Sequence, residues 1–600
     1  MKKKQLILSA LLLLIVTFAA LSPSLIASFS NWDDQIMITQ NTKIMSMSWK
    51  SIKVWFTTFH ERLYHPLVLM SYAVEYHFFK FDARVYHATN LVLHLLNTLF
   101  VFWFVYLISK KNLIALITAL LFGIHPMHVE SVIWLPERKD VLYSFFFLGS
   151  LISYLYFLKD KKRNFYYLCM FLFTLSFLSK SMAMTLPFIL LLCDYLLKVK
   201  IDRKNLIDKV PFFALSFLFA FITVMGHYEP GVEGREFSFS LIGNIVSACQ
   251  NIVFYLIKLV LPFKLSCIYP PPSQMQNIPQ VIFFLAPVIV IALIALMFWS
   301  GKYSRIGIFG GLFFLVTVAP VSQILPVGLR IPADRYTYIP YIGFFYIFAE
   351  CFALAYEKYD KKLLMGLLSA LFLVLFILSF QRALVWRKST VLWDDVIRNY
   401  KNIPIAYFNR ADEYFLRTGY HDKALADNAI GEPDKAIAYY DQALKINPYY
   451  VKAWYNRGII YLNRGEFDKA ISDFSRTINL RPNYADALNR RGGTYFKMEN
   501  FEKAYIDFSQ AIRADPNYAD AYYNRGLTCF KMGNFEKAYI DFSQAIQADP
   551  TNADAYYDRA AVSTWRGDAA SALSDVLKAQ SLGKKVDQQV IDKLRMEMKK

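Results

Sequence analysis

The feature that most constrains the fold of this chain is a strict 34-residue period in its C-terminal third. Four kinds of residue recur at that spacing: Pro448, Pro482, Pro516 and Pro550; Gly458, Gly492, Gly526 and Ala560; Ala470, Ala504, Ala538 and Ala572; and Phe474, Phe508 and Phe542. Small residues let two helices approach closely, phenylalanine fills the space between successive hairpins, and proline restarts the chain after each second helix. The period therefore predicts a stack of helical hairpins.

This pattern is typical of tetratricopeptide repeats, and we expect such an all-α solenoid over residues 405–585. Its first unit, about 405–448, is irregular and carries about a dozen extra residues between Arg410 and Gly431, while residues 586–600 are expected to form a capping helix. The arginine that recurs at Arg457 and every 34 residues afterwards is expected to be structural. First helices of such repeats commonly face a partner, which gives a candidate partner surface of Tyr455, Asp486, Asp520, Tyr523, Asp554 and Tyr557.

Residues 1–385 differ in composition and are expected to form a polytopic transmembrane helical bundle, joined to the array by a linker at 386–404. The chain as a whole is 56% hydrophobic and 17% aromatic, too apolar for a soluble protein. After a first apolar run that ends near Ala27, further runs lie at roughly 86–108, 112–124, 140–158, 165–179, 182–198, 209–226, 239–263, 279–299, 305–325, 336–355 and 361–380. We expect about 11–12 spans, several of them short.

Basic clusters predict the orientation of these spans. They lie at Lys2–Lys4, Lys110-Lys111, Lys159–Arg163, Lys198–Lys209, Lys302–Arg305 and Glu357–Lys362 and are expected to be cytoplasmic. The N-terminus would then be cytoplasmic, and the loops 28–85, 125–139 and 326–335 would be outside. This alternation requires one run not to cross, and we nominate 239–263 as interfacial or re-entrant. The repeat array would then also lie outside, at a bacterial plasma membrane, although Arg382, Arg387 and Lys388 argue mildly against it.

Two further questions concern the first 85 residues. The first apolar run is expected to be a retained anchor, with a cleaved signal peptide as the alternative. In the long loop that follows, Pro66–Phe79 is too short and too polar to span, so an interfacial helix is expected there.

Charge and cysteine content exclude other classes. The net charge of +19 comes mostly from short clusters between apolar runs, so the positive-inside rule accounts for it and nucleic-acid binding is not expected. The six cysteines have neither CxxC nor metal-ligand spacing, so we expect no disulfide framework and no zinc site.

The expected outer loops contain the candidate site residues. Asn31-Trp32-Asp33-Asp34 brings two adjacent carboxylates, Asp33 and Asp34, to the membrane surface, although such pairs are often only solvated or cap a helix. In the second loop, His125, His128 and Glu130 suggest either interfacial hydrogen bonding, substrate contact or, less readily, a metal site, because Pro126 breaks the helix that would align them. The sequence requires no divalent ion, although the acidic pair is able to bind one.

Charges at the entrances of predicted spans are a second group. Arg138 and Asp140 precede one span and Asp334, Arg335 and Tyr336 precede another. A charge retained there usually pairs or binds something, and an arginine fork suits phosphate. Pairing of Arg138 with Asp140 is the structural alternative. Lys180 lies between two short runs on the same side, with snorkelling to the interface as its alternative.

Taken in order, these motifs resemble the transmembrane and tetratricopeptide-repeat O-mannosyltransferases. The motifs are Asn31-Trp32-Asp33-Asp34, the His-Pro-x-His-x-Glu stretch ending in Arg138-Lys139-Asp140, Lys180, and Ala333-Asp334-Arg335-Tyr336-x-Tyr338-Ile339-Pro340. The resemblance implies a GT-C class fold, a polyprenyl-phosphate-linked sugar as donor, and a first-loop carboxylate at the reaction centre. It also implies donor-phosphate contacts from Arg138 and Arg335, with Lys180 as a further candidate cation.

The expected function is therefore transfer of a sugar, mannose by resemblance, to an acceptor hydroxyl on protein at the outer face of the membrane. The repeats would hold the acceptor or a partner near the site. A membrane-anchored scaffold without enzymatic activity is the alternative. It explains the repeats but not the charged loops or the many spans. A transporter is a third possibility, although the charges lie at span ends rather than at the bilayer midplane.

Overall fold

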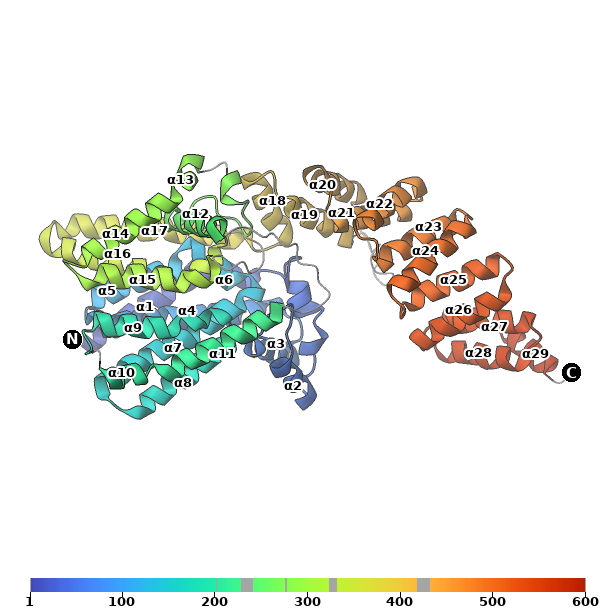
Figure 1. The fold of residues 1–600 in the computed structure, drawn as a ribbon, viewed down its shortest axis with the longest axis horizontal. Coiled ribbons are helices and arrows are strands. Elements are labelled where there is room, and N and C mark those ends of the chain that lie inside the picture. The colour runs from blue at the N-terminus through green and yellow to red at the C-terminus, as the bar shows by residue number, and fades with distance from the viewer. Residues whose placement is uncertain are drawn as a thin grey trace. The chain divides into compact units, whose positions relative to one another are not determined.

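The structure is a computed structural model and describes residues 2–200, 202–227, 241–275, 278–322, 332–417 and 432–598. The chain divides into two compact units, Met1–Ile403 and Pro404–Lys600, and each is considered by itself. The described residues are helical and contain no β-strand, only an isolated bridge between His60 and Leu63 (Figure 1). The predicted all-α class is confirmed.

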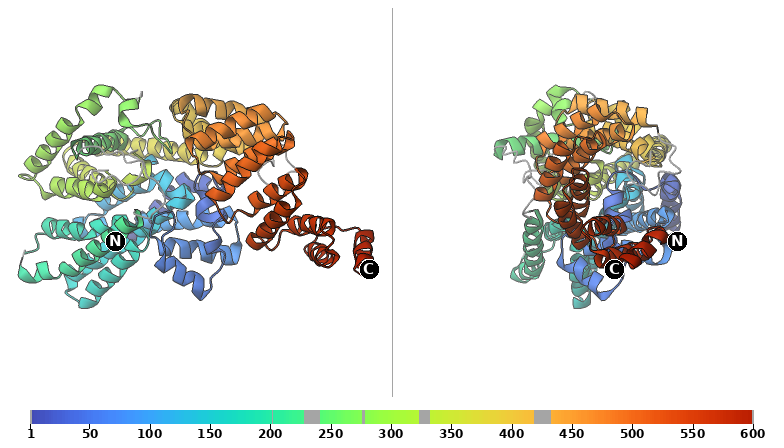
Figure 2. Two further views of the ribbon diagram at one scale, coloured as in Figure 1. Left: turned by 45° about the vertical axis from the view of Figure 1, so that its right-hand side comes forward. Right: turned by 90° about the vertical axis from the view of Figure 1, so that its right-hand side faces the viewer.

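The first unit is a bundle of helices that pack along one another (Figures 1 and 2). Its helices are α1 (Lys2–Leu21), α2 (Trp49–Thr57), α3 (Pro66–Phe79), α4 (Ala83–Ser109), α5 (Asn112–Ile124), α6 (Val129–Ile133), α7 (Arg138–Asp160), α8 (Arg163–Phe177), α9 (Leu186–Leu196), α10 (Arg203–Ile207), α11 (Val210–His227), α12 (Leu241–Val260), α13 (Gln280–Phe284), α14 (Ala286–Ser300), α15 (Arg305–Val318), α16 (Tyr341–Lys358), α17 (Lys361–Val385) and α18 (Ser389–Asn399).

Six of these helical segments are long and apolar enough to cross a membrane, judged by length and composition over the described residues. They are Lys3–Ile26, Ala83–Ser109, Leu135–Asp160, Arg203–Gly226, Leu241–Val260 and Lys361–Val385. The pair Asn112–Ile124 and Pro126–Ile133, bent by 54°, makes a seventh if it counts as one span. Shorter apolar helices at Ser181–Leu196, Ala286–Ser300 and Arg305–Val321 overlap the predicted runs 182–198, 279–299 and 305–325.

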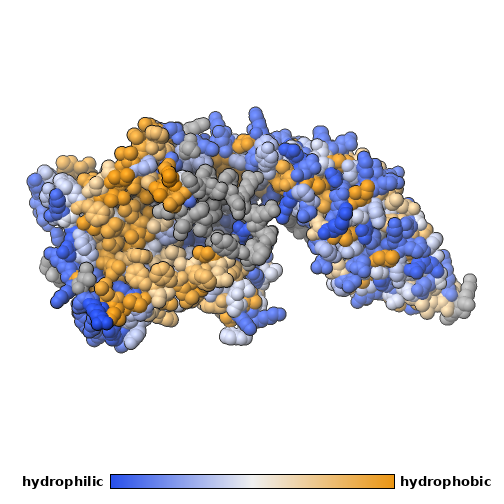
Figure 3. All heavy atoms as spheres, viewed as in Figure 1, coloured by the Kyte–Doolittle hydropathy of each residue, from blue (hydrophilic) through white to orange (hydrophobic). Residues whose placement is uncertain are grey.

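Figure 3 shows the corresponding surface: a broad apolar face over the region of α14, α15 and α11, with hydrophilic residues at the end of the bundle near α10. Leu241–Val260 is long enough to cross by the same criteria as the other five segments. Length and composition therefore do not set it apart, and its interfacial or re-entrant placement stays a prediction.

The long first loop forms a small core of its own around α3, which occupies the predicted range Pro66–Phe79. Val68, Tyr72 and Ala73 are fully buried against residues of the preceding segment such as Trp55. The outward residues of α3 are also apolar, namely Met70, Val74, Phe78 and Phe79. An apolar outer face on a short helix favours contact with the bilayer surface.

The second unit is the repeat array. Its helices are α19 (Pro404–Arg417), α20 (Pro433–Ile446), α21 (Val451–Asn463), α22 (Phe467–Leu480), α23 (Ala485–Lys497), α24 (Phe501–Ala514), α25 (Ala519–Lys531), α26 (Phe535–Ala548), α27 (Ala553–Trp565), α28 (Ala569–Ser581) and α29 (Gln588–Glu597). The extra residues expected between Arg410 and Gly431 fall largely at 418–431, outside the described residues. The range expected to be a linker contains α18, and the range expected to cap the array contains α29.

The small periodic residues of the array let paired helices approach closely, as predicted, whereas the phenylalanines contact the glycine of their own hairpin rather than only filling the space between hairpins. A Cβ atom added to Gly458, Gly492 or Gly526 would lie 2.8–2.9 Å from the phenylalanine ring of the following helix, so only glycine permits this approach. Ala470, which recurs every 34 residues, is fully buried at each of its four positions. Each repeated arginine donates two hydrogen bonds of 2.7–2.9 Å to an aspartate 16 residues later, so its expected structural role is confirmed.

Candidate functional site

The first loop after α1 is held by the segment that follows α17. The backbone N–H of Asn31 donates to Ser389 Oγ at 3.0 Å, and Trp393 Nε1 donates to Asn31 Oδ1 at 2.7 Å. The backbone N–H of Ser28 donates to the carbonyl of Arg387 at 3.1 Å. Residues more than 350 positions apart in sequence therefore fix the loop that carries the carboxylate pair.

Tryptophans from three parts of the chain gather beside this loop. Trp32 stacks on Trp134 with ring centroids 4.3 Å apart and meets Trp393 edge to face at 5.4 Å. Trp134 also lies 6.1 Å from Trp386. Because aromatic stacking fixes ring orientation, these contacts hold the first loop against the second loop and the end of α17.

Asp34 is the more buried of the two carboxylates. Its side chain is 2% exposed, Oδ2 accepts a hydrogen bond from the backbone N–H of Ser30 at 2.6 Å, and Oδ1 accepts none from any described residue. Burial raises the pKa of Asp34 to about 7, although the hydrogen bond from Ser30 acts in the opposite direction. This carboxyl group therefore titrates near neutral pH.

Asp33 is only partly buried and is affected by charges of the other two loops. Burial raises the pKa of Asp33, while the positive charges of Lys139 and Arg335 act to lower it. The structure thus brings the first loop within electrostatic range of Lys139, more than 100 positions later in the sequence, and of Arg335, about 300 positions later. The sequence could suggest this meeting only through the orientation of the spans.

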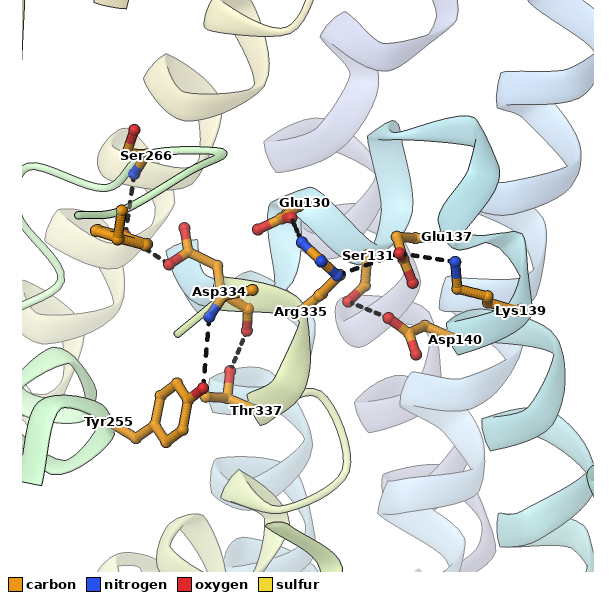
Figure 4. A network of polar contacts seen from close by, with 12 residues as sticks. Glu130, Ser131, Glu137, Lys139, Asp140, Tyr255, Ser266, Asp334, Arg335 and Thr337 are labelled. Atoms are coloured by element: carbon orange, nitrogen blue, oxygen red, sulfur yellow. Dashed lines mark hydrogen bonds and ion pairs between the residues drawn. The ribbon is translucent and has the colours of Figure 1, made fainter. Parts of the chain in front are cut away.

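The second and third loops meet in a cluster of ion pairs (Figure 4). Arg335 lies between two carboxylates, with Nη1 2.5 Å from Glu130 Oε1 and Nε 3.2 Å from Glu137 Oε1. Lys139 Nζ is 3.0 Å from Glu137 Oε1. Arg335 also stacks over the Trp134 ring at 5.1 Å, so the ion cluster and the tryptophans are continuous.

Asp140 and Lys180 complete the cluster. Lys180 forms an ion pair with Asp140 and lies 3.6 Å from Glu137 Oε2, and Ser131 Oγ donates to Asp140 Oδ2 at 3.3 Å. Burial lowers the pKa of Lys180, but these two carboxylates outweigh it and raise the pKa above its ordinary value. Lys180 is therefore a buried, paired cation rather than one that snorkels freely to the interface.

Arg138 is placed differently from the other predicted cations. Its side chain is fully buried and pairs with Glu75 Oε2 at 2.5 Å, while Nε donates to Asn90 Oδ1 at 2.8 Å and Nη2 to the carbonyl of Tyr86 at 2.7 Å. The structural alternative was that Arg138 pairs with Asp140, and this is not what the structure shows. Arg138 instead joins α7 to α3 and α4, and its donors face these helices.

The histidines of the second loop are packed among aromatic rings. His125 Nε2 donates to the carbonyl of Leu259 at 3.2 Å, and His128 Nδ1 donates to that of Phe122 at 2.8 Å. Of the three roles considered for these histidines, hydrogen bonding is the one that matches these contacts with main-chain carbonyls. Within the described ranges, no group of three or more His, Cys, Asp or Glu side chains is arranged to hold a metal ion.

Asp334 and Tyr336 flank Arg335. Asp334 is fully buried, and its Oδ1 accepts a hydrogen bond from Tyr269 OH at 2.6 Å. The Tyr336 ring lies 4.9 Å from the Arg335 guanidinium. Burial raises the pKa of Asp334 to about 6, while the positive charge of Arg382, the hydrogen bond from Tyr269 and the charges of Lys258 and Arg335 act to lower it.

Several residues of this region were not among the predicted site residues. Glu137 and Lys139 stand beside predicted residues and are part of the ion cluster. Arg382 was interpreted only as a topology signal. Arg382 could have been singled out by its position at the end of a long apolar run, because a charge retained near the end of a span usually pairs or binds a ligand.

In the array, most of the candidate partner residues contact neighbouring residues of the array. Asp486 Oδ1 accepts from Tyr518 OH at 2.7 Å, and Tyr523 OH donates to Asp558 Oδ2 at 2.8 Å. Lys584 pairs with Asp554 and lies 4.8 Å from the Tyr557 ring. The Tyr455 ring packs 5.1 Å from that of Tyr484. Asp520 has no hydrogen-bond or ion-pair partner among the described residues. The partner-binding role of the whole set stays a proposal.

The fold and these sites define a class: a polytopic membrane protein that carries a tetratricopeptide-repeat array. The tetratricopeptide-repeat family model matches residues 451–484 and 519–552, and two further repeat models match 492–533 and 418–450. The predicted array is confirmed. Among solved structures, YrrB, described as a tetratricopeptide-repeat protein with an unusual peptide-binding site, is 20% identical and covers 34% of this chain and 97% of its own, with a TM-score of 0.28.

Two curated relatives are more specific. The chain is similar to protein O-mannosyl-transferase TMTC1 of Mus musculus, with 35% identity over 15% of this chain and 10% of that protein. It is also similar to protein O-mannosyl-transferase F38B6.6 of Caenorhabditis elegans, with 23% identity over 64% of this chain and 54% of that protein. The matched segments thus span from about a tenth to about half of these relatives. The resemblance read from the motifs is confirmed by these matches.

Proposed function

We propose that this protein is a membrane glycosyltransferase of the GT-C class that moves a sugar, mannose by analogy with its relatives, from a polyprenyl phosphate to a hydroxyl group on a protein. The observation that carries the proposal is the meeting of three distant loops. Asp33 lies in electrostatic reach of Arg335, Glu137 and Lys139, and the neighbouring Trp32 stacks on Trp134, over which Arg335 lies. The two relatives are named protein O-mannosyl-transferases, which supports the same reaction.

In the proposed reaction, the acceptor hydroxyl oxygen forms a bond to the anomeric carbon of the sugar, and the bond from that carbon to the phosphate oxygen breaks. The hydroxyl proton passes to the carboxylate of Asp33, the more accessible of the pair, and the bonding electrons leave with polyprenyl phosphate. General-base assistance of this kind contributes about 10²–10⁴-fold in rate. Asp34, tied to the Ser30 backbone, holds Asp33 in place.

The positive charges of the cluster would stabilise the phosphate as it departs. Arg335 and Lys180 offer fixed charges whose positions are set by Glu130, Glu137 and Asp140, so they need not reorganise during the reaction. Arg138, the third predicted phosphate contact, is engaged with Glu75 and Asn90, so we assign it the role of holding α7 in position.

A lipid-linked donor is supported by an apolar cavity of about 430 Å³ between α12, α14, α15 and α16. Phe314, which lines it, packs against Tyr341, whose hydroxyl donates to the carbonyl of Tyr255 at 2.6 Å. Tyr255 OH in turn accepts the backbone N–H of Ala333, the neighbour of Asp334, at 3.4 Å. An isoprenoid chain in this cavity would have its phosphate end directed toward the third loop.

The proposal includes a sidedness. Alternation of the basic clusters favours a plasma-membrane protein with a cytoplasmic N-terminus and with the three loops and the array on the outer side. The array would hold the acceptor polypeptide or an envelope partner, which raises its effective concentration at the site. The scaffold alternative explains the array equally well but gives no role to the loop carboxylates.

The test is transfer of radiolabelled sugar from a panel of polyprenyl-phosphate donors by the full chain in lipid nanodiscs. We expect Asp33→Asn to lower kcat by about 10²-fold or more, the loss of a general base. Arg335→Lys, which keeps the charge but loses the fork, should lower it less. Asp160→Asn removes the same charge at an exposed position at the end of α7 and should have wild-type activity.

Two results would count against the proposal. Transfer unaffected by Asp33→Asn, with the variant folded, would remove the assigned base. If no donor in the panel is used, and Asp33→Asn and Asp34→Asn are also silent in cells where deletion of the gene has a phenotype, the scaffold function is the better one.

A further inference from the structure

Arg382, near the end of α17, is a buried arginine with an open hydrogen-bonding edge. Its side chain is 6% exposed, and Nη1 donates to Asp395 Oδ2 at 2.8 Å. Nε and Nη2 are buried and donate to no described residue. A buried charged donor that lacks an acceptor is energetically costly, so this edge has the character of a binding site.

The two unsatisfied groups are on the same edge of the guanidinium. Nε–H and one Nη2–H point in parallel, which is the geometry that binds two oxygens of a phosphate or carboxylate at once. The other arginines of the region lack this opening, since Arg335 faces Glu130 and Glu137, and Arg138 faces Glu75 and Asn90. Arg382 is therefore better placed than either to bind an oxyanion directly.

Trp386, one helical turn later, adds a third donor. Its ring lies 5.9 Å from the Arg382 guanidinium, and its Nε1 is buried with no hydrogen-bond partner among the described residues. Residues four apart on a helix share one face, and Trp386 directly follows α17, so its unpaired indole N–H lies close to the open guanidinium.

Arg382 lies in a region where positive and negative side chains are mixed. Arg382, Lys258 and Arg335 all act electrostatically on the carboxyl group of Asp334. Lys258 donates to the backbone carbonyl of Phe263, and no ion pair joins it to a carboxylate in the described part of the chain. Arg335 is already paired with Glu130 and Glu137 and Arg382 with Asp395, while the charge of Lys258 acts on Asp334, so this region has no surplus of positive charge. Binding of an anion here therefore depends on the open donor groups of Arg382.

We propose that Arg382 and the indole N–H of Trp386 bind the phosphodiester of the lipid-linked donor and the phosphate of the lipid product. The inference rests on the proposed function and deepens it, because it assigns the direct phosphate contact to a residue outside the ion cluster. A phosphodiester carries one negative charge and two free oxygens, which match one open guanidinium edge. Arg335 and Lys180 then act on the phosphate from a distance, through their charge.

The experiment measures equilibrium binding of a radiolabelled short-chain polyprenyl phosphate to the full chain in phosphatidylcholine nanodiscs. We expect Arg382→Gln to weaken binding about 10-fold or more, as for loss of a charged hydrogen bond. Arg382→Lys keeps the charge without the fork and should lie between that variant and wild type. Trp386→Phe keeps the ring but removes the N–H and should weaken binding a few-fold.

Three controls separate the phosphate from other contributions. Asp395→Asn breaks the ion pair of Arg382 but leaves its open edge, so affinity should stay near that of wild type. The uncharged polyprenol should bind wild type and Arg382→Gln equally. Inorganic phosphate should compete only weakly, since it lacks the chain that would fill the apolar cavity. Strong competition by inorganic phosphate would instead assign the site to free phosphate.

The outcomes distinguish this inference from the proposed function. Normal binding by folded Arg382→Gln and Trp386→Phe, with transfer that depends on Asp33, would overturn the inference and leave the function standing. Equal loss of binding in Arg382→Gln and Asp395→Asn would also overturn it, because the ion pair alone would then explain the loss. Binding that depends on Arg382, in a protein that transfers no sugar from any donor, would support the phosphate site and overturn the proposed reaction.

Discussion

The two units of this protein use charged residues in opposite ways. In the array, each repeated arginine is partly exposed and pairs with an aspartate 16 residues later, by the same two hydrogen bonds in four successive repeats. In the membrane unit, Arg335 pairs with Glu130 across 205 positions, and Arg138 pairs with Glu75 across 63. The array pairs are local and repeated, whereas the membrane-unit pairs join separate loops or helices. Of these two membrane-unit arginines, only Arg138, which is fully buried, is less exposed than the array arginines.

The physical consequence lies in what happens when one partner is lost. A pair at the surface is screened by water and is worth little, while a pair removed from water leaves an uncompensated charge when it is broken. Loss of a partner should therefore be most severe at the fully buried Arg138–Glu75 pair and milder at the partly exposed arginines of the array.

The largest effect is expected at the Arg138–Glu75 pair. Arg138→Ala would leave the Glu75 carboxylate buried without its partner, a cost of about 3–5 kcal/mol. We expect most of this variant to aggregate in detergent, as measured by size-exclusion chromatography. The double variant Arg138→Met, Glu75→Leu removes both charges and should recover much of the folded protein. A folded Arg138→Ala that loses only affinity for the donor would instead make Arg138 a phosphate contact.

A smaller effect, dependent on pH, is expected at Asp34. Its folded-state pKa of about 7 lies above the unfolded value near 3.8, so the folded state holds a proton that the unfolded state has lost. Wild-type stability should therefore fall as pH rises from about 4 to 7 and change little above that window. Asp34→Asn cannot ionise, and its amide oxygen still accepts the Ser30 N–H.

The measurement is the apparent melting temperature of wild type and Asp34→Asn in nanodiscs at pH 5 and pH 8. The stability of the variant relative to wild type should rise between pH 5 and pH 8, by on the order of a few kcal/mol. Asp160→Asn, an exposed control, should show no such trend. A gain that is the same at both pH values would contradict the ionisation argument.

The sequence predicted more of the array than of the membrane unit, because the contacts of the array are local in sequence and those of the membrane unit are long-range. The spacing of Gly492 and Phe508 predicted a contact because both belong to one repeat, and repeats bury their core between neighbours. Nothing local predicts that Trp393 donates to Asn31, or that Arg138 turns to Glu75, because these contacts depend on how the helices pack. The orientation of the spans predicted which loops lie on the same side, but it did not predict which residues of those loops pair with one another.

Within the array, two adjacent glycines allow a sharper test. A Cβ atom on Gly492 would lie 2.9 Å from the Phe508 ring, whereas one on Gly493 would meet nothing within 4 Å. Gly492→Ala should destabilise α23 and α24 by about 1–3 kcal/mol through overpacking. Gly493→Ala should be neutral or stabilise the helix by up to about 1 kcal/mol. Amide hydrogen exchange of these helices in the intact protein measures both, and equal effects would show that the close helix contact is not what requires glycine.

The smallest effect is expected at the repeated arginines. Arg457 and Arg525 bind their later aspartates alike, but Nη1 of Arg457 faces the carboxylate of Asp441, whereas that of Arg525 donates to the Ser509 hydroxyl at 3.1 Å. Substitution by glutamine should cost about 1 kcal/mol at either site, measured by exchange of the adjoining helices. Because Asp441 is half exposed, its extra attraction is screened, so raising the salt concentration should bring the effect of Arg457→Gln toward that of Arg525→Gln. A loss of several kcal/mol of stability at either arginine, comparable to that expected at Arg138, would contradict this prediction. The stability of the array would then depend on its ion pairs as strongly as that of the membrane unit.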